Sequence, residues 1–200
     1  LGAYSHIAAE NLYAGAEIKT CITFEETFRQ AYNDSNFKIV IPIENSLAGR
    51  VADIHYLLPK YKLQIHGEYF QPVEHNLLCK PEAIEKDIKF VRSHAQAIGQ
   101  CQNLINKKKL KSIISADTAG SAKDLAEGDD KSIAAIASEL SAKIYKLKIL
   151  EKNIEDEKGN VTRFLIMGKN IEQPEHNNKK KYITSCIFRV KSEPSALYKC

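Results

Sequence analysis

The stretch IVIPIENSLAGRVADIHYLL, residues 39–58, decides how the rest of the chain can fold. It opens with an apolar, β-branched run at residues 39–41, which predicts a buried strand. Pro42 has no backbone N–H, so we expect the strand to end there. A polar cluster at 44–46 follows, and from Val51 apolar residues recur at helical spacing. A strand that turns into a helix beside hydroxyl and amide groups is suited to hold an anion, because the helix start offers free N–H groups and a positive dipole end.

The bulk composition is that of an ordinary soluble globular protein. The 200 residues are 44% hydrophobic and 27% charged, with a formal net charge of +4. Part of the positive excess lies in two lysine runs, 107–109 and 179–181. Such runs are usually solvated, and no nucleic-acid-binding motif accompanies them, so we expect no nucleic-acid partner. No apolar run approaches the length of a membrane span, so no membrane partner is expected either.

The cysteines and histidines give no sign of a metal site. Five cysteines are unevenly spaced and include no CxxC pair. That pattern favours reduced thiols in a cytoplasmic protein over a disulfide framework or a zinc site. The six histidines show no metal-ligand spacing, so each is expected to be a surface or hydrogen-bonded residue.

Helical and extended patterns alternate along the first part of the chain. The order is helix, strand, helix, strand and helix, with strands at 17–22 and 37–43 and a capping-box pattern at 23–26 that starts the second helix. This alternation predicts an α/β layer with a mainly parallel sheet. Two extended segments, 63–69 and 74–79, then lead to a second alternating set. Its strands are expected at 88–91, 111–115 and 132–136, and its helices at 94–106, 118–126 and 138–147.

We therefore expect an α/β protein with two lobes and a cleft between them. The strand predicted at 161–167 would return from the second lobe to the first. Lobe 1 would comprise about 1–72 plus 160–168, and lobe 2 about 73–159. Residues 169–181 carry Pro, Asn and Lys without apolar periodicity and are expected to be a linker, and 182–200 would form a strand and the start of a helix.

Four expected strand-to-helix junctions carry small polar side chains. In a parallel sheet such junctions gather at the carboxyl ends of the strands, where ligands bind. Hydroxyl and amide groups beside helix starts suit a small carboxylate, although each junction taken alone is explained at least as well by helix capping. The junctions are Asn45-Ser46, Ser93-His94, Asp117-Thr118 and Ser138.

The strand around Arg163 is different. An arginine within an apolar run costs free energy unless it meets an anion, and its guanidinium binds a carboxylate through two parallel hydrogen bonds. Thr162 would point to the opposite face of a regular strand, whereas at a strand start or a bulge both side chains could reach a cleft. The alternative is an edge strand with Arg163 in solvent and Thr162 selected for β propensity.

Taken together, these motifs resemble the prephenate dehydratase family. The resemblance covers about residues 1–168 in the family's order, and the combination of PIENS with TRF is quite specific. Its segments are GAYS at 2–5, PIENS at 42–46, SHAQA at 93–97, DTA at 117–119, AAIA at 134–137 and TRF at 162–164. Residues 183–199 look like the beginning of the ACT regulatory domain, which in this family binds phenylalanine and inhibits the enzyme.

The resemblance implies a bilobed α/β catalytic region similar to type 2 periplasmic binding proteins, followed by the start of an ACT domain of the ferredoxin-like α+β type. It also implies a carbon–oxygen lyase of L-phenylalanine biosynthesis, which converts prephenate to phenylpyruvate, water and CO2 without a metal or organic cofactor. Prephenate carries two carboxylates, which would give Arg163 and the helix starts natural partners. The full-length protein would be inhibited by L-phenylalanine and would form a homodimer or homotetramer.

By the family's pattern, Thr162 is the expected catalytic residue, acting as a hydrogen-bond donor to the departing hydroxyl. Arg163 would face a substrate carboxylate, and Phe164 would pack beside the substrate ring. The other residues expected to line the cleft are Asn45, Ser46, Gln96 and Thr118. Ala196 and Leu197 would contribute to effector binding in the ACT segment.

Three points depart from the family's pattern or stay open. The ESRP effector motif is absent and Ser195 replaces a usual glycine, so phenylalanine inhibition is expected of the full-length protein rather than of this chain. The choice between prephenate and arogenate is open. A carboxylate-binding protein of the periplasmic type without chemistry, and an amino-acid-sensing regulatory protein, are the alternative functions.

Overall fold

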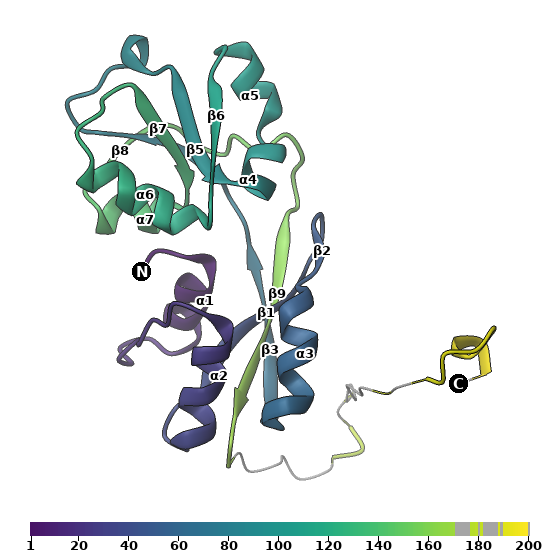
Figure 1. Cartoon of the computed structure of the whole chain (residues 1–200). Coiled ribbons are helices and arrows are strands. Elements are labelled where there is room, and N and C mark those ends of the chain that lie inside the picture. Colours follow the sequence, from purple (N-terminus) through teal and green to yellow (C-terminus); the bar gives the residue numbers. More distant parts are fainter. Residues whose placement is uncertain (171–176, 180, 182–187, 189, 200) are drawn as a thin grey trace.

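The computed structural model describes residues 1–170, 177–179, 181, 188 and 190–199. The chain forms two lobes, each built on its own sheet, with the strand order β2-β1-β9-β3 in lobe 1 and β6-β5-β7-β4-β8 in lobe 2 (Figure 1). Lobe 1 contains α1 (Tyr4–Leu12), α2 (Phe24–Asn33), β1 (Ile39–Asn45), β2 (Gly49–Arg50), α3 (Ala52–Tyr61), β3 (Gln64–Pro72) and β9 (Val161–Gly168).

Lobe 2 lies between β3 and β9 in the sequence. Its elements are β4 (Asn76–Cys79), the short 3-10 helix η1 (Glu85–Asp87), β5 (Phe90–His94), α4 (Ala95–Gly99), α5 (Gln102–Lys107), β6 (Lys111–Ser115), α6 (Thr118–Glu127), β7 (Ile133–Ala137), α7 (Glu139–Ile144) and β8 (Lys148–Glu151). The chain crosses between the lobes twice, before β4 and before β9, and these two crossings run side by side because Val73 N donates to Asn160 O over 2.8 Å.

The predicted mainly parallel sheet is wrong for lobe 1. There β9 lies between β1 and β3 and is antiparallel to both. The chain returns from lobe 2 when it forms β9. The direction of β9 is therefore set by the connection of almost ninety residues between β3 and β9 rather than by a local crossover helix. In lobe 2 the prediction holds for β6, β5 and β7, which are parallel, and fails at β4, which is antiparallel to β7 and β8.

Three local predictions are also corrected. Residues 17–22 form no strand. Ile22, one of the apolar residues on which that prediction rested, is 96% exposed and therefore packs against no sheet. β1 continues through Pro42, because the strand is bulged directly after that residue and an irregular ladder tolerates the missing N–H. The helix expected at 94–106 is divided into α4 and α5. The carboxylate of Asp156 accepts from Gln102 N and Asn103 N over 2.8 and 3.0 Å, so a distant residue starts the second helix.

The core of lobe 1 lies on one face of its sheet. Phe28 of α2 and Ile54 of α3 are fully buried there against Leu165 and other β1 and β9 side chains. The start of α2 is capped as predicted, with Thr23 Oγ1 accepting from Glu26 N over 3.1 Å. α1 packs against β1 and β3 on the other face.

Predictions for the end of the chain fall largely on residues that the structure does not describe. The linker and the strand expected within 169–190 lie mostly outside the described residues. Where a helix was expected to start, at 193–196, the described residues form a turn that leads into the short 3-10 helix η2 (Leu197–Lys199). Leu197 is exposed there, and Ala196 is half-buried.

Candidate functional site

A β-bulge in β1 decides which side chains meet at the start of β9. Residues 39–42 pair one to one with 167–164, but the register shifts between Pro42 and Glu44. As a result Glu44 lies opposite Arg163, and Asn45 lies opposite Thr162. Because one extra residue in a strand exchanges the two faces, the bulge is what places the Asn45 amide on the side of Thr162.

The Asn45 side chain is oriented by the backbone that follows it. Its Oδ1 accepts from Leu47 N and Ala48 N over 3.0 and 2.9 Å. The NH2 end must therefore face the other way, and it donates to Thr162 Oγ1 over 2.9 Å. Because Thr162 Oγ1 accepts this bond, its own proton points elsewhere, and Thr162 makes no other side-chain hydrogen bond within the described part of the chain. The Thr162 hydroxyl can therefore donate its proton to a further group.

The amide of Asn45 also connects Thr162 to lobe 2. Its Nδ2 donates to Asn160 Oδ1 over 2.6 Å, and Asn160 Nδ2 donates to Gln100 Oε1 over 2.9 Å. Gln100 follows α4, and its Oε1 also lies 2.9 Å from His75 Nε2. We call these five residues, Thr162, Asn45, Asn160, Gln100 and His75, the interlobe network. The sequence around Asn160, Gln100 and His75 indicates no role for these residues, since nothing in their local pattern shows that they meet.

Burial favours the neutral form of His75. The side chain is 2% exposed, and this burial lowers the pKa of His75, opposed by the Gln100 hydrogen bond and the Glu155 charge. Tyr4 OH lies 3.1 Å from His75 Nδ1 and also 2.7 Å from Glu74 O, and the Glu155 carboxylate accepts from His75 N over 3.0 Å. These are the polar groups that face the imidazole from α1, from lobe 2 and from the crossing segments.

We expect the stability of the fold to decrease as the pH falls below about 6.5, the ordinary pKa of an unfolded histidine. Since the pKa of His75 is lower in the folded protein, the unfolded chain binds more protons in this range, and stability is complete only above it. Thermal unfolding measured from pH 7.5 to 5 checks this. His75→Gln, which keeps a donor but does not titrate, should show a shallower decrease, and identical slopes for the two proteins would contradict the assignment.

Arg163 lies on the opposite face from Thr162. Its Nη1 contacts Glu44 Oε1 at 3.0 Å, its Nε and Nη2 both contact Glu68 Oε2 at 2.7 Å, and its guanidinium lies 6.0 Å from the Phe70 ring centre. The sequence predicted that Arg163 meets an anion, and in the structure its anionic partners are two carboxylates of lobe 1, Glu44 and Glu68. The contact of Arg163 with a substrate carboxylate stays a prediction.

Replacing Arg163 by Gln should lower the free energy of unfolding by about 1 kcal/mol, since half-exposed ion pairs stabilise weakly. Denaturant unfolding measures the change. Glu68→Gln is the matched control, and the double variant should lose less than the sum of the two single losses because both remove the same pair. Strict additivity would show that the pair does not contribute.

The remaining candidate residues either stabilise the fold or lie at the edge of lobe 2. Ser93 and Ser138 are buried, and their Oγ atoms donate to Ile136 O and Gly2 O over 2.7 Å each, so they act within the fold. Ser46 Oγ accepts from Val161 N over 3.0 Å, which holds the start of β9 beside the network. Phe164 is 1% exposed, so its ring is part of the core.

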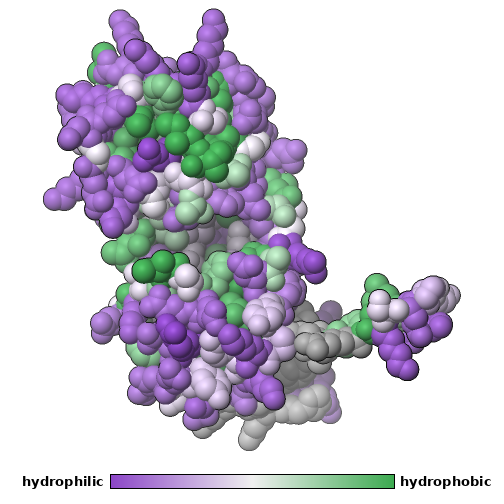
Figure 2. Space-filling model, in the orientation of Figure 1, coloured by the Kyte–Doolittle hydropathy of each residue, from purple (hydrophilic) through white to green (hydrophobic). Residues whose placement is uncertain are grey.

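Gln96 and Thr118 lie in the first turns of α4 and α6, which follow the neighbouring parallel strands β5 and β6. The carboxyl ends of these strands face lobe 1 (Figure 1). Gln96 is exposed and Thr118 is half-buried, and no hydrogen bond joins either side chain to the interlobe network among the described residues. The backbone of Gln96 does contact the network, because Gln96 O accepts from Gln100 N over 3.0 Å at the end of α4. The surface between the two lobes is hollowed (Figure 2). The structure thus brings Asn45, Ser46 and Thr162 together and places Gln96 and Thr118 on the lobe that faces them.

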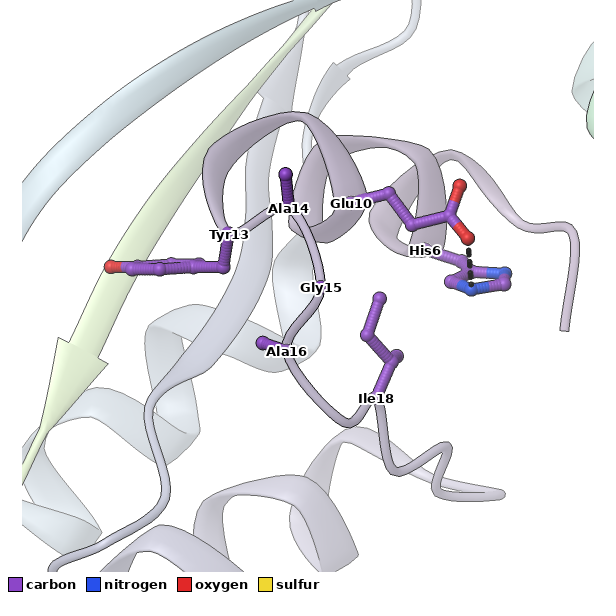
Figure 3. A pocket seen from close by; sticks show the side chains of 7 residues that line it. All are labelled: His6, Glu10, Tyr13, Ala14, Gly15, Ala16 and Ile18. Atoms are coloured by element: carbon purple, nitrogen blue, oxygen red, sulfur yellow. Dashed lines mark ion pairs between the residues drawn. The ribbon is translucent and has the colours of Figure 1, made fainter.

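A separate depression lies at the end of α1 and carries no convergent chemistry. It is lined by His6, Glu10, Tyr13, Ala14, Gly15, Ala16 and Ile18. His6 Nε2 pairs with Glu10 Oε1 at 3.3 Å, while the Tyr13 ring points away from both (Figure 3). Among the residues described, no group of three His, Cys, Asp or Glu side chains could hold a metal ion, and no helix is long and apolar enough to cross a bilayer.

The chain is similar to a well-defined set of proteins. A family model described as prephenate dehydratase matches residues 1–172. The bifunctional N-acyl-homoserine lactone acylase/prephenate dehydratase of Komagataeibacter europaeus is 37% identical over 201 residues, covering 99% of this chain and 70% of that protein. Arogenate dehydratase/prephenate dehydratase 2 of Arabidopsis thaliana is 39% identical over 198 residues, covering 99% of this chain and 51% of that protein.

The same similarity holds in three dimensions. The crystal structure of prephenate dehydratase from Arthrobacter aurescens, in complex with L-Phe, matches with a TM-score of 0.81 and 25% sequence identity. The match covers 88% of this chain and 60% of that one. The chain thus spans between about half and 70% of the length of these relatives.

Proposed function

The chain belongs to the prephenate dehydratase family, and from this we propose that it catalyses the decarboxylating dehydration of prephenate to phenylpyruvate, water and CO2. One observation supports this most directly: the Thr162 hydroxyl accepts from Asn45, which leaves its proton available to a ligand at the lobe boundary. That is the group which the departure of a hydroxide requires.

In the proposed reaction the C–O bond of the ring hydroxyl and the C–C bond to the ring carboxylate both break. The electron pair of the C–C bond enters the ring, which becomes aromatic, and the carboxylate leaves as CO2. Negative charge develops on the departing oxygen, which takes up a proton from solvent to form water. Thr162 donates a hydrogen bond to that oxygen, and a donor fixed in advance stabilises the charge without reorganisation during the step.

The substrate would lie between the lobes. We propose that Asn45 and Ser46 contact it from lobe 1 and Gln96 and Thr118 from lobe 2. This is supported by the placement of α4 and α6 at the sheet edge that faces lobe 1, where helix starts offer N–H groups to a carboxylate. No step needs a metal or an organic cofactor, because aromatisation drives the loss of CO2.

We further propose that the longer protein is cytoplasmic, forms a homodimer or homotetramer and is inhibited by L-phenylalanine. The Arthrobacter aurescens protein was solved with L-Phe bound. The described cysteines, Cys21, Cys79 and Cys101, are free thiols, as expected for a reducing compartment.

A turnover assay tests the proposal. Prephenate and arogenate are supplied separately to this chain and to a longer version, with and without L-phenylalanine, and phenylpyruvate is measured by its absorbance in alkali. N-acyl-homoserine lactones are supplied in the same assay as a further test compound, because one relative is named for both activities. Release of phenylpyruvate from prephenate supports the proposal. Tight prephenate binding without turnover would support the non-catalytic carboxylate-binding alternative instead.

A further inference from the structure

The hydrogen-bond directions along the interlobe network follow from two backbone N–H groups. Leu47 N and Ala48 N fix the oxygen of the Asn45 amide, so its nitrogen end must donate to Asn160 Oδ1. The nitrogen of Asn160 must then donate to Gln100, which presents its oxygen. Each amide has one donor end and one acceptor end, so no member can turn over without leaving two like groups in contact.

The last member of the network is fixed in the same way. Gln100 Oε1 can only accept, so His75 Nε2, 2.9 Å away, carries a proton. His75 Nδ1 is then the unprotonated nitrogen of the neutral ring; it lies 3.1 Å from the Tyr4 hydroxyl, which donates its proton to Glu74 O over 2.7 Å. The ring is buried and cannot exchange these partners for water.

We propose that His75 and Gln100 are positioning residues for the reaction, which hold Asn160 and through it the Asn45 amide that directs the Thr162 hydroxyl. This inference rests on the proposed function of Thr162. Neither residue touches the substrate. His75 and Gln100 are in lobe 2 or at its edge, whereas Asn45 and Thr162 are in lobe 1, so the direction of the hydroxyl depends on how the lobes lie against each other.

Loss of the network should act on turnover more than on binding. His75→Phe removes the donor to Gln100, and Gln100→Leu removes the acceptor for Asn160. We expect each to lower kcat for prephenate about tenfold with KM changed less than twofold, since an interaction realised in the transition state affects kcat. His75→Gln, whose amide can still donate to Gln100, should restore most of the lost kcat. Gln102→Leu is the matched control, because that side chain bonds to Ile98 O outside the network.

Circular dichroism and thermal unfolding establish that each variant is folded, and kcat is calculated per folded molecule. Gln100 is only half-buried, so Gln100→Leu keeps the test open if His75→Phe does not fold. An unchanged kcat in a folded Gln100→Leu variant would overturn the proposal. Nitrogen-15 NMR of the His75 ring gives a second readout that needs no activity. A protonated Nε2 with a bare Nδ1 is expected, and the opposite tautomer would overturn the proposal even if the chain does not turn over prephenate.

Discussion

Thr162→Ala is expected to lower kcat for prephenate by about 10²–10³-fold, the range found when one donor to a developing oxyanion is removed. Among the described residues the proton of this hydroxyl has no acceptor, because Thr162 Oγ1 accepts from Asn45 and makes no other side-chain hydrogen bond. The fold should survive, since Thr162 is half-buried and Asn45 keeps Asn160 as an acceptor. Steady-state kinetics of phenylpyruvate formation measures the loss.

Thr162→Ser is the matched control for this substitution. It keeps the hydroxyl and loses only the methyl group, so kcat should stay within about tenfold of the parent chain, as expected for a retained donor. If the alanine variant turned over prephenate normally, Thr162 would have no part in the reaction. If serine and alanine were equally inactive, the methyl contact rather than the hydroxyl would be the important feature.

Phe164→Ala is expected to lower the free energy of unfolding by about 3–5 kcal/mol, the usual cost of truncating a buried phenylalanine. The ring is 1% exposed and lies in the central strand of the lobe 1 sheet, between Pro42 of β1 and Tyr69 of β3 in the register. Its removal leaves a cavity that the paired strands cannot close. Denaturant unfolding measures the effect.

Phe70→Ala is the matched control, because Phe70 lies on the neighbouring strand and is 56% exposed. Its loss should cost less than about 1 kcal/mol, as is usual for a surface position. Equal losses for the two phenylalanines would show that the core around β9 is less tightly packed than its burial indicates.

Helices and strands were predictable from the sequence where the residues that determine them lie within the element or next to it. β6 covers 111–115 as expected, and α2 begins after Thr23 because its capping side chain lies within the same turn. The division between α4 and α5 was not predictable, since the cap on α5 comes from Asp156, more than fifty residues away. β8 was missed as well, and its pairing to β4 depends on a distant strand.

The site was predictable only in part. The resemblance singled out Asn45 and Thr162, and the structure places them in contact. The residues 43–46 carry no signal for the register shift that makes this contact, because a bulge is defined by both strands. The partners His75 and Gln100 come from separate segments of lobe 2, and the bonds of Asn160 to Gln100 and to Asn45 connect them to lobe 1.

The position of β9 between β1 and β3 has a consequence for how the protein is synthesised. Residues 161–168 leave the ribosome after all of lobe 2, so lobe 2 can fold first. During that time β1 and β3 are not yet joined, because β9, which pairs with both, has not been synthesised. Each of them exposes an unpaired backbone edge during that interval, which is a template for association with other nascent chains. A chain released before residue 161 would keep both edges open, so we expect lobe 1 rather than lobe 2 to associate with other chains at that stage.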